Sequence, residues 1–189
     1  MRRNGTRKPD ILSGGDGKDR LKGKGGDDAL FGYDDDDRLW GGGGNDGLFG
    51  FEGDDFLFGG GGIDALYGGE GRDVLRGGGG HDVLLGGEGG DRLWGGKGLD
   101  NFMIGHSDAA DRIMDWRARD DQITILAYEE YPDFTGVRRK DVKIVDKGRW
   151  DHVRVEGETV AKVKGEVTQR DIDIAISETN VDFGDPLLN

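Results

Sequence analysis

The chain has 189 residues, and its composition is unlike that of an ordinary globular protein: 39 residues are glycine, 39 are Asp or Glu, and the formal net charge is -13. With only 33% hydrophobic residues, such a chain stays unfolded unless something neutralises its charge. The acidic balance excludes nucleic acids and anionic membranes as default partners and points to cations. The absence of cysteine excludes disulfides and thiolate metal sites.

Residues 1–13 form an N-terminal segment that carries charge but no apolar stretch of the kind found in a secretory signal peptide. No later stretch approaches the roughly 18 apolar residues of a membrane span, so no membrane span is expected. Within this segment, Gly5, Asp10 and Leu12 fit, as a degenerate copy, the repeat that begins at residue 14.

Residues 14–103 consist of ten copies of a nine-residue repeat, G-G-x-G-x-D-x-U-x, in which U is a large apolar residue. Position six is Asp in every copy, and position eight is Leu in the first nine copies and Phe102 in the last. Four residues depart from the glycine pattern: Lys24, Tyr33 and Phe51 at position two, and Asp35 at position four. The turns that contain them are expected to be strained, because a side chain disfavours a left-handed backbone.

A nine-residue unit is too short for a helix and its connection, but it accommodates a six-residue turn and a three-residue strand. Glycine at positions one, two and four allows positive φ in the turn. Position eight, in the middle of the strand, points inward, while positions seven and nine point outward. Two repeats complete one coil, and alternate repeats stack about 4.8 Å apart in two parallel sheets. The predicted fold is all-β: a right-handed parallel β-roll, or solenoid, of nonapeptide repeats with a C-terminal β cap.

Each Asp at position six is expected to face the Asp two repeats further on. Carboxylate and carbonyl oxygens, without nitrogen or sulfur, are the ligands that Ca²⁺ prefers. These pairs predict about eight Ca²⁺ ions, or nine if Asp10 contributes. Without metal, the thin apolar core and the self-repulsion predict an unfolded array. The predicted carboxylate ligands are Asp10, Asp19, Asp28, Asp37, Asp46, Asp55, Asp64, Asp73, Asp82, Asp91 and Asp100.

Residues 104–189 are expected to close and cap the roll, because an open solenoid end exposes unpaired strand edges. The Asp-x-apolar pattern continues at irregular spacing in Asp111–Trp116 and Asp121–Leu126. Residues 142–160 alternate between apolar and polar and contain two glycine turns, which predicts an antiparallel meander of about three strands. A short helical turn is expected at residues 168–171.

The nonapeptide of residues 5–103 resembles the repeat-in-toxin (RTX) pattern of calcium-binding β-helix repeats. The stretch from Asp111 to Ile125 also resembles the segment that closes the roll in serralysin-like metalloproteases. The resemblance implies an extracellular calcium-binding protein of a Gram-negative bacterium, exported by the type I secretion apparatus through an uncleaved C-terminal signal and folded by external calcium. Residues 182–189 are the candidate signal. It also implies that turn carbonyls are ligands: those of Gly15, Gly17, Gly42, Gly44, Gly60, Gly62, Gly69, Gly71, Gly78, Gly80, Gly87 and Gly89.

Other motifs in the chain do not indicate an enzyme. Residues 42–47 match the dinucleotide fingerprint G-x-G-x-x-G, but no strand of a βαβ unit precedes them and they fall in the repeat register. Residues 34–37 lack the glycine and the distal Glu of an EF-hand loop. His106, Ser107 and Asp108 are adjacent and therefore cannot converge as a catalytic triad. No H-E-x-x-H zinc motif is present.

The outward position nine of the even-numbered repeats is apolar throughout: Phe31, Phe49, Tyr67, Leu85 and Met103. This row indicates either cross-strand stacking that stabilises a thin sheet or a docking surface for a second copy or for a protein or cell-surface partner. Two roles of the chain stay open. It is a stand-alone secreted binding or adhesion module, or a secretion and folding module detached from a secreted protease, lipase or alginate-modifying enzyme.

Overall fold

The structure is a computed structural model, and it describes residues 1–105, 109–117, 120–128, 142–146, 151–155, 158–164 and 172–177. All regular secondary structure in these residues is β-strand. No helix in this part of the chain is long and apolar enough to cross a membrane. The predicted helical turn at 168–171, the candidate export signal at 182–189 and the segment 106–108 lie outside the described residues.

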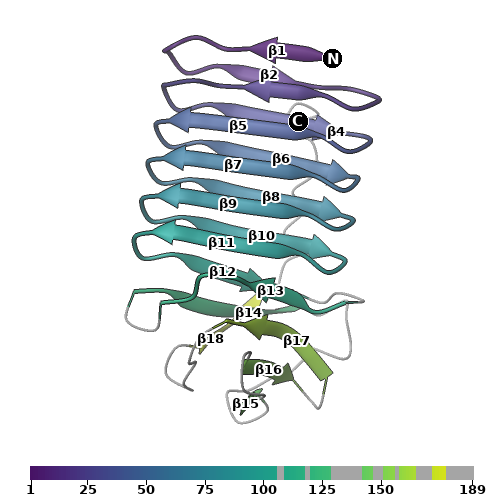
Figure 1. Ribbon diagram of the computed structural model, residues 1–189, viewed down its shortest axis with the longest axis vertical. Helices are drawn as coiled ribbons and strands as arrows, with labels where there is room; N and C mark the ends of the chain where they lie inside the picture. Colours follow the sequence, from purple (N-terminus) through teal and green to yellow (C-terminus); the bar gives the residue numbers. More distant parts are fainter. Residues whose placement is uncertain are drawn as a thin grey trace.

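The strands belong to two sheets, which Figure 1 shows as the two sides of a stack of coils. Sheet 1 has ten strands in the order β1-β3-β5-β7-β9-β11-β13-β17-β16-β15, and sheet 2 has eight in the order β18-β14-β12-β10-β8-β6-β4-β2. Successive strands along the repeats therefore alternate between the sheets, as predicted for a coil of two repeats. The repeat strands are β1 (Arg2–Asn4), β2 (Ile11–Ser13), β3 (Arg20–Lys22), β4 (Ala29–Tyr33), β5 (Arg38–Gly43), β6 (Gly47–Glu52), β7 (Phe56–Gly61), β8 (Ala65–Glu70), β9 (Val74–Gly79), β10 (Val83–Glu88), β11 (Arg92–Lys97) and β12 (Asn101–Ile104).

The register within each sheet is one coil, or 18 residues. Leu39 lies beside Leu57 in sheet 1, and Leu48 lies beside Leu66 in sheet 2, with every strand pair in the repeats parallel. All position-eight residues from Leu21 to Phe102 point inward and are at most 2% exposed. Each such side chain contributes roughly 1.5–3 kcal/mol on burial. The core is thus one apolar ladder per sheet, as the repeat predicts.

The first three strands have the predicted three residues, but the repeat strands from β4 on are longer. Each strand from β5 to β11 spans six residues, from position seven of one repeat to position three of the next. The extension follows from the register: Gly60 pairs with Gly78, and Gly61 pairs with Gly79, one coil apart. Half of the predicted turn therefore belongs to the sheets, and only positions four to six are left to make the bend.

The turn backbone is left-handed at positions two and four in all ten repeats, including those without glycine there. Lys24, Tyr33, Phe51 and Asp35 have φ values of 89°, 80°, 79° and 73°. Each costs about 1–2 kcal/mol relative to glycine. Position one was predicted to have positive φ as well, and this is wrong. An added Cβ on Gly41 would instead clash with Asp46 Oδ2 and, at 2.7 Å, with the Gly59 carbonyl oxygen, so glycine is required there by space.

The closing region extends both sheets. In sheet 1, β13 (Asp111–Ile113) pairs in parallel with β11 and then with β17 (Glu158–Val163). The predicted meander is present, since β15 (Val142–Asp146), β16 (Asp151–Val155) and β17 are antiparallel neighbours. In sheet 2, β14 (Gln122–Tyr128) and β18 (Ile172–Ser177) continue the parallel stack beyond β12. The last strands of the roll therefore have partners instead of open edges.

The predicted row of apolar side chains on sheet 2 is in register from β4 to β12. The rings of Phe31 and Phe49 stack with centroids 5.2 Å apart. Beside them, the rings of Tyr33 and Phe51 stack at 5.3 Å with an interplanar angle of 6°. Such aromatic pairs contribute about 0.5–1.5 kcal/mol each, which offsets part of the cost of the left-handed backbone at Tyr33 and Phe51.

Gly60→Ala is expected to destabilise the calcium-loaded roll by more than about 1 kcal/mol, because Gly60 has a φ of 121° and an added Cβ would overlap the carbonyl oxygen of Gly42. Gly61→Ala is the matched control, because nothing lies within 4 Å of a Cβ at that neighbour. Urea unfolding of both variants in saturating calcium measures the difference. Equal stabilities would contradict the steric account of position two.

Candidate metal centre

The predicted carboxylate ligands form two stacks inside the turns. The ten Asp at position six, from Asp19 to Asp100, are each between 0% and 3% exposed. In each stack the backbone N–H of one Asp donates to Oδ1 of the Asp one coil further on, as from Asp46 to Asp64 and from Asp64 to Asp82, both at 2.9 Å. The predicted pairing of each Asp with the Asp two repeats away is therefore present.

The second carboxylate oxygen of these residues is buried without a hydrogen bond within the described part of the chain. This holds for Oδ2 of Asp19, Asp28, Asp37, Asp46, Asp55, Asp64, Asp73, Asp82 and Asp100. A buried acceptor without a partner costs about 1–3 kcal/mol, and more when it is charged. A regular series of such atoms indicates that the fold is completed by cations.

Asp10, in the degenerate copy, differs from the others. Its backbone N–H donates to Asp28 Oδ1 at 2.8 Å, so it belongs to the stack. Its Oδ2, however, accepts a hydrogen bond from the backbone N–H of Thr6 at 2.5 Å and another from the Thr6 hydroxyl at 2.9 Å. Asp10 Oδ2 therefore has hydrogen-bond donors within its own turn, which Oδ2 of the regular repeats lacks.

Sequence analysis did not assign Asp111 and Asp121 to the site, but both continue the stacks. Asp91 N–H donates to Asp111 Oδ1 at 3.1 Å, and Asp100 N–H donates to Asp121 Oδ1 at 3.2 Å. The spacings are 20 and 21 residues because the connecting turns are longer than in the repeats. The Asp-x-apolar pattern at both positions is the signal that identifies them, although the irregular spacing hides the register.

The backbone carbonyls of the turns supply further oxygen atoms. All twelve glycines predicted as carbonyl ligands have positive φ, and so do Gly26, Gly53, Gly96 and Gly98 at equivalent positions. The carbonyl oxygens of Gly42 and Gly44 lie against Gly60 and Gly62 of the next coil. Those of Lys24 and Phe51 lie in the same way against Gly42 and Gly69. The non-glycine residues thus keep their carbonyls in the repeating position.

This donor set fits a hard cation. Carboxylate and carbonyl oxygens suit Ca²⁺, which takes six to eight oxygen ligands in a flexible geometry. No group of three or more His, Asp or Glu side chains within the described residues gathers around one point. A cation in these turns would be held by one or two carboxylates together with carbonyls, and this ligand set stays a prediction.

Burial makes the ionised form of these carboxyls unfavourable without a cation. It raises the pKa of Asp55 to about 7, and the charge of Asp37 adds to the effect, while the hydrogen bond from the Asp37 backbone opposes it. In the same way burial raises the pKa of Asp73 to about 9 and of Asp37 to about 6. Burial, followed by the charge of Asp91, raises the pKa of Asp111. The folded turns therefore take up either protons or metal ions.

The pattern of the RTX calcium-binding nonapeptide repeat matches residues 4–30, 13–48, 31–66, 49–84 and 67–102. Together these matches cover more than half of the chain. The chain belongs to the RTX calcium-binding nonapeptide repeat family. The matched residues end at 102. The similarity of the closing region to serralysin-like proteases therefore stays a prediction.

Among solved structures, the RTX chain is similar to the extracellular lipase LipA from Serratia marcescens, with 14% identity and a TM-score of 0.37 over 93% of this chain. The chain spans 40% of the length of that lipase. It is also similar to the AlgE6R3 subunit of the Azotobacter vinelandii mannuronan C5-epimerase, with 19% identity and a TM-score of 0.30 over 95% of this chain and 84% of the subunit. No curated protein matches the sequence.

In a chelator, the β content of the chain is expected to rise when the pH is lowered from about 8 to about 4. The folded state binds protons at carboxyls with pKa values of about 6 to 9, whereas in the unfolded chain they bind only near the ordinary 3.8. This contribution to stability is full below 3.8 and is lost as the pH rises through 6 to 9. Far-UV circular dichroism measures it, and an unchanged spectrum down to about pH 4 would contradict it.

Proposed function

We propose that the chain is a secreted protein that folds on binding about eight Ca²⁺ ions between the coils of its roll. The observation that carries this proposal is the series of buried Asp oxygens without a hydrogen bond, which lie against the position-one glycines and, in most turns of residues 14–73, close to a carbonyl oxygen of the next coil. The number of ions is taken as one for each pair of Asp residues that are 18 residues apart within the ten repeats. The ligands are the position-six Asp and the carbonyls of positions two and four.

Calcium coupling implies where the protein is folded. Extracellular calcium modules bind with dissociation constants of roughly 10⁻⁴ to 10⁻³ M. At such an affinity the chain would stay unfolded in calcium-poor cytoplasm and fold after export, which supports secretion by a type I apparatus and an extracellular location. Asp111 and Asp121, which extend the two carboxylate stacks, make the closing region part of the calcium-dependent fold.

The role proposed for the folded chain is that of a binding or adhesion module without catalytic activity. It is supported by the outer face of sheet 1, which carries the cationic side chains of Arg92, Arg112 and Lys162 in register. The second candidate is a secretion and folding module of a longer secreted enzyme. The natural reading frame around this sequence distinguishes the two, because the second role requires a catalytic domain in the same polypeptide.

The purified chain is expected to gain β structure cooperatively with Ca²⁺ at about millimolar concentration and to gain none with Mg²⁺. Mg²⁺ requires a near-octahedral site and gives up its water reluctantly, so carbonyls fixed in the turns do not suit it. Far-UV circular dichroism during parallel titrations measures the effect. A chain already folded in excess chelator near neutral pH would show that the repeats are a metal-independent scaffold.

Asp64→Asn is expected to raise the midpoint of the calcium titration several-fold, because Asp64 belongs to two successive pairs, with Asp46 and with Asp82. The substitution keeps the shape of the side chain but replaces the charged oxygen Oδ2 with an amide nitrogen. Glu70→Gln removes the same charge from an exposed position and serves as the control. If both variants raise the midpoint equally, net charge and not ligation explains the calcium dependence.

A further inference from the structure

The outer face of sheet 1 carries the opposite charge to the protein as a whole. Its outward rows, at positions seven and nine from β1 to β11 and continued in β13 and β17, contain Arg and Lys together with Asn4 and aromatic and apolar residues, and no Asp or Glu. The position-seven row, in register from coil to coil, is Arg2, Arg20, Arg38, Phe56, Val74, Arg92, Arg112 and Lys162. The position-nine row is Asn4, Lys22, Trp40, Phe58, Arg76 and Trp94.

Sheet 2 shows that this charge is a property of one face and not of the repeat. Its rows at positions seven and nine from β2 to β14 contain no charged residue, and its position-three row carries the acids Glu52, Glu70 and Glu88 in register. The position-seven row there is Ile11, Ala29, Gly47, Ala65, Val83, Asn101 and Gln122. Both sheets are built from the same repeat, so the difference arises from the residues at positions seven and nine of the odd-numbered copies, which form sheet 1. The cations are thus placed on one side of the roll.

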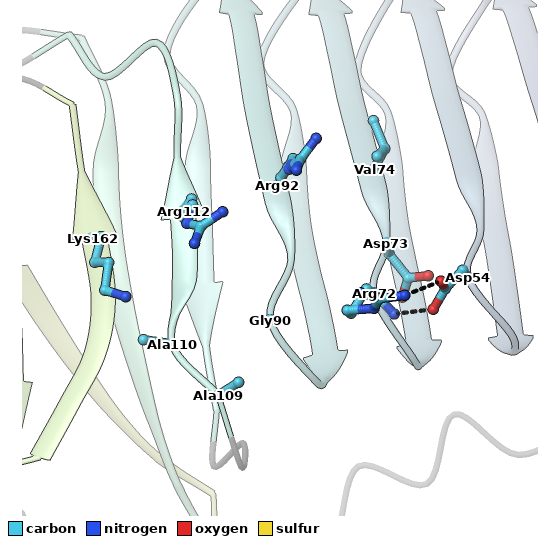
Figure 2. A pocket seen from close by; sticks show the side chains of 10 residues that line it. All are labelled: Asp54, Arg72, Asp73, Val74, Gly90, Arg92, Ala109, Ala110, Arg112 and Lys162. Atoms are coloured by element: carbon cyan, nitrogen blue, oxygen red, sulfur yellow. Dashed lines mark hydrogen bonds and ion pairs between the residues drawn. The ribbon is translucent and has the colours of Figure 1, made fainter.

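Three of these cations form a continuous group, which we name the basic row: Arg92 on β11, Arg112 on β13 and Lys162 on β17. Arg92 pairs in register with Arg112, and Arg112 with Lys162. Figure 2 shows the three side chains on successive strands of one face. None of them has an ion pair within the described parts of the chain.

The basic row borders a hollow of about 530 Å³. The hollow exists because Gly90, Ala109 and Ala110 offer little or no side chain there, where the preceding coils carry Asp54 and Arg72. Arg72 is already paired with Asp54 at 2.8 Å. Asp73, the remaining acid in the lining, is 1% exposed and belongs to the calcium-ligand stack. The cationic charge without a partner in this hollow therefore comes from the basic row.

Like charges directly opposite each other on neighbouring strands destabilise a sheet. Two such contacts in succession weaken the fold unless an anion lies over them. We propose that the basic row binds a linear polysaccharide that carries carboxylate or sulfate groups. The row runs along the axis of the roll, and its spacing of about 4.8 Å is close to the length of one pyranose ring. An extended acidic glycan along the axis would place anionic groups beside successive cations.

The aromatic residues of the face favour a glycan over a nucleic acid. Single-stranded nucleic acids bind largely by stacking bases on open aromatic faces. Here Arg76 lies 4.9 Å from the ring centroid of Trp94 and 5.6 Å from that of Phe56, and Lys22 lies 4.7 Å from that of Trp40. These cations occupy ring faces that bases would need. They also hold the guanidinium and ammonium groups in place for an anionic partner.

The acidic composition does not oppose this site once the protein is folded. The charge of the proposed calcium ions, about eight in number, would outweigh the formal net charge of -13. This step rests on the proposed function. The site is therefore expected to bind its anion only in calcium, both because the roll must fold and because the repulsion from the Asp stacks must be removed.

Isothermal titration calorimetry of the full chain in saturating calcium tests the proposal. The probes are short oligogalacturonates, which do not gel with calcium, and heparin oligosaccharides, which separate carboxylate from sulfate recognition. Neutral cello-oligosaccharides and oligothymidylate are the comparison ligands. At least one acidic glycan is expected to bind, more weakly as salt is added, and more tightly than either comparison ligand.

The variant Arg92→Gln/Arg112→Gln/Lys162→Gln is expected to lose about tenfold or more in affinity for the acidic glycan. The variant Arg2→Gln/Arg20→Gln/Arg38→Gln, which removes the same charge from three in-register residues at the far end of the face, is expected to bind nearly as well as the unmodified chain. Circular dichroism titrations with calcium confirm that both variants fold. They also separate a failure of calcium-coupled folding from a failure of the glycan site.

Four results would overturn the proposal. The first is equal loss in both variants, which would show non-specific attraction. The second is tighter binding of oligothymidylate than of either acidic glycan. The third is the absence of binding by a chain that folds normally in calcium. The fourth is self-association, measured by sedimentation, that the substitutions in the basic row abolish, since it would assign the row to a second copy of the chain.

Discussion

The structure depends on buried carboxylates in which one oxygen accepts a hydrogen bond and the other does not. From Asp28 to Asp100, Oδ1 of each position-six Asp accepts a backbone N–H from the preceding coil, which fixes the carboxyl in the interior. The second oxygen is buried against the position-one glycine of the same turn, where an added Cβ would clash with it. Without a cation, the ionised carboxyl is poorly accommodated there. A divalent cation resolves the conflict, and the same ion removes the repulsion that otherwise keeps so acidic a chain unfolded.

The sequence was sufficient to predict the coil, the inward ladders and the Asp pairing, because an uninterrupted period leaves one register that buries Leu39 on Leu57 and aligns every Asp. It also predicted the meander of β15 to β17 from local alternation. It did not predict that Gly41 is required by space alone, since the obstacles, Asp46 Oδ2 and a carbonyl one coil away, meet this position only in the folded coil. Asp111 was missed for a related reason: the longer turn before it changes the spacing while three-dimensional contact preserves the stack.

A core only one side chain thick leaves the outer surfaces free to differ. The inward positions are fixed by packing, whereas the outward rows affect stability through neighbouring strands alone. Sheet 2 uses this freedom for stacked rings such as Phe31 on Phe49, and sheet 1 uses it for cations beside indole rings such as Arg76 and Trp94. The same repeat therefore supports two chemically distinct surfaces on one rigid support.

The hydrogen bonds between the Asp residues run in one direction along the molecule. The main chain of each coil donates to the carboxylate of the coil that follows it, so Asp82 depends on Asp100, and Asp100 in turn depends on Asp121. An Asp N–H thus depends on the coil that follows it. The N–H at position seven has the opposite dependence, because it donates to the carbonyl of the Asp one coil earlier, as from Phe56 to Asp37 and from Ala65 to Asp46. Each coil is therefore held from both sides, and a break anywhere in the roll leaves unpaired donors at both new ends.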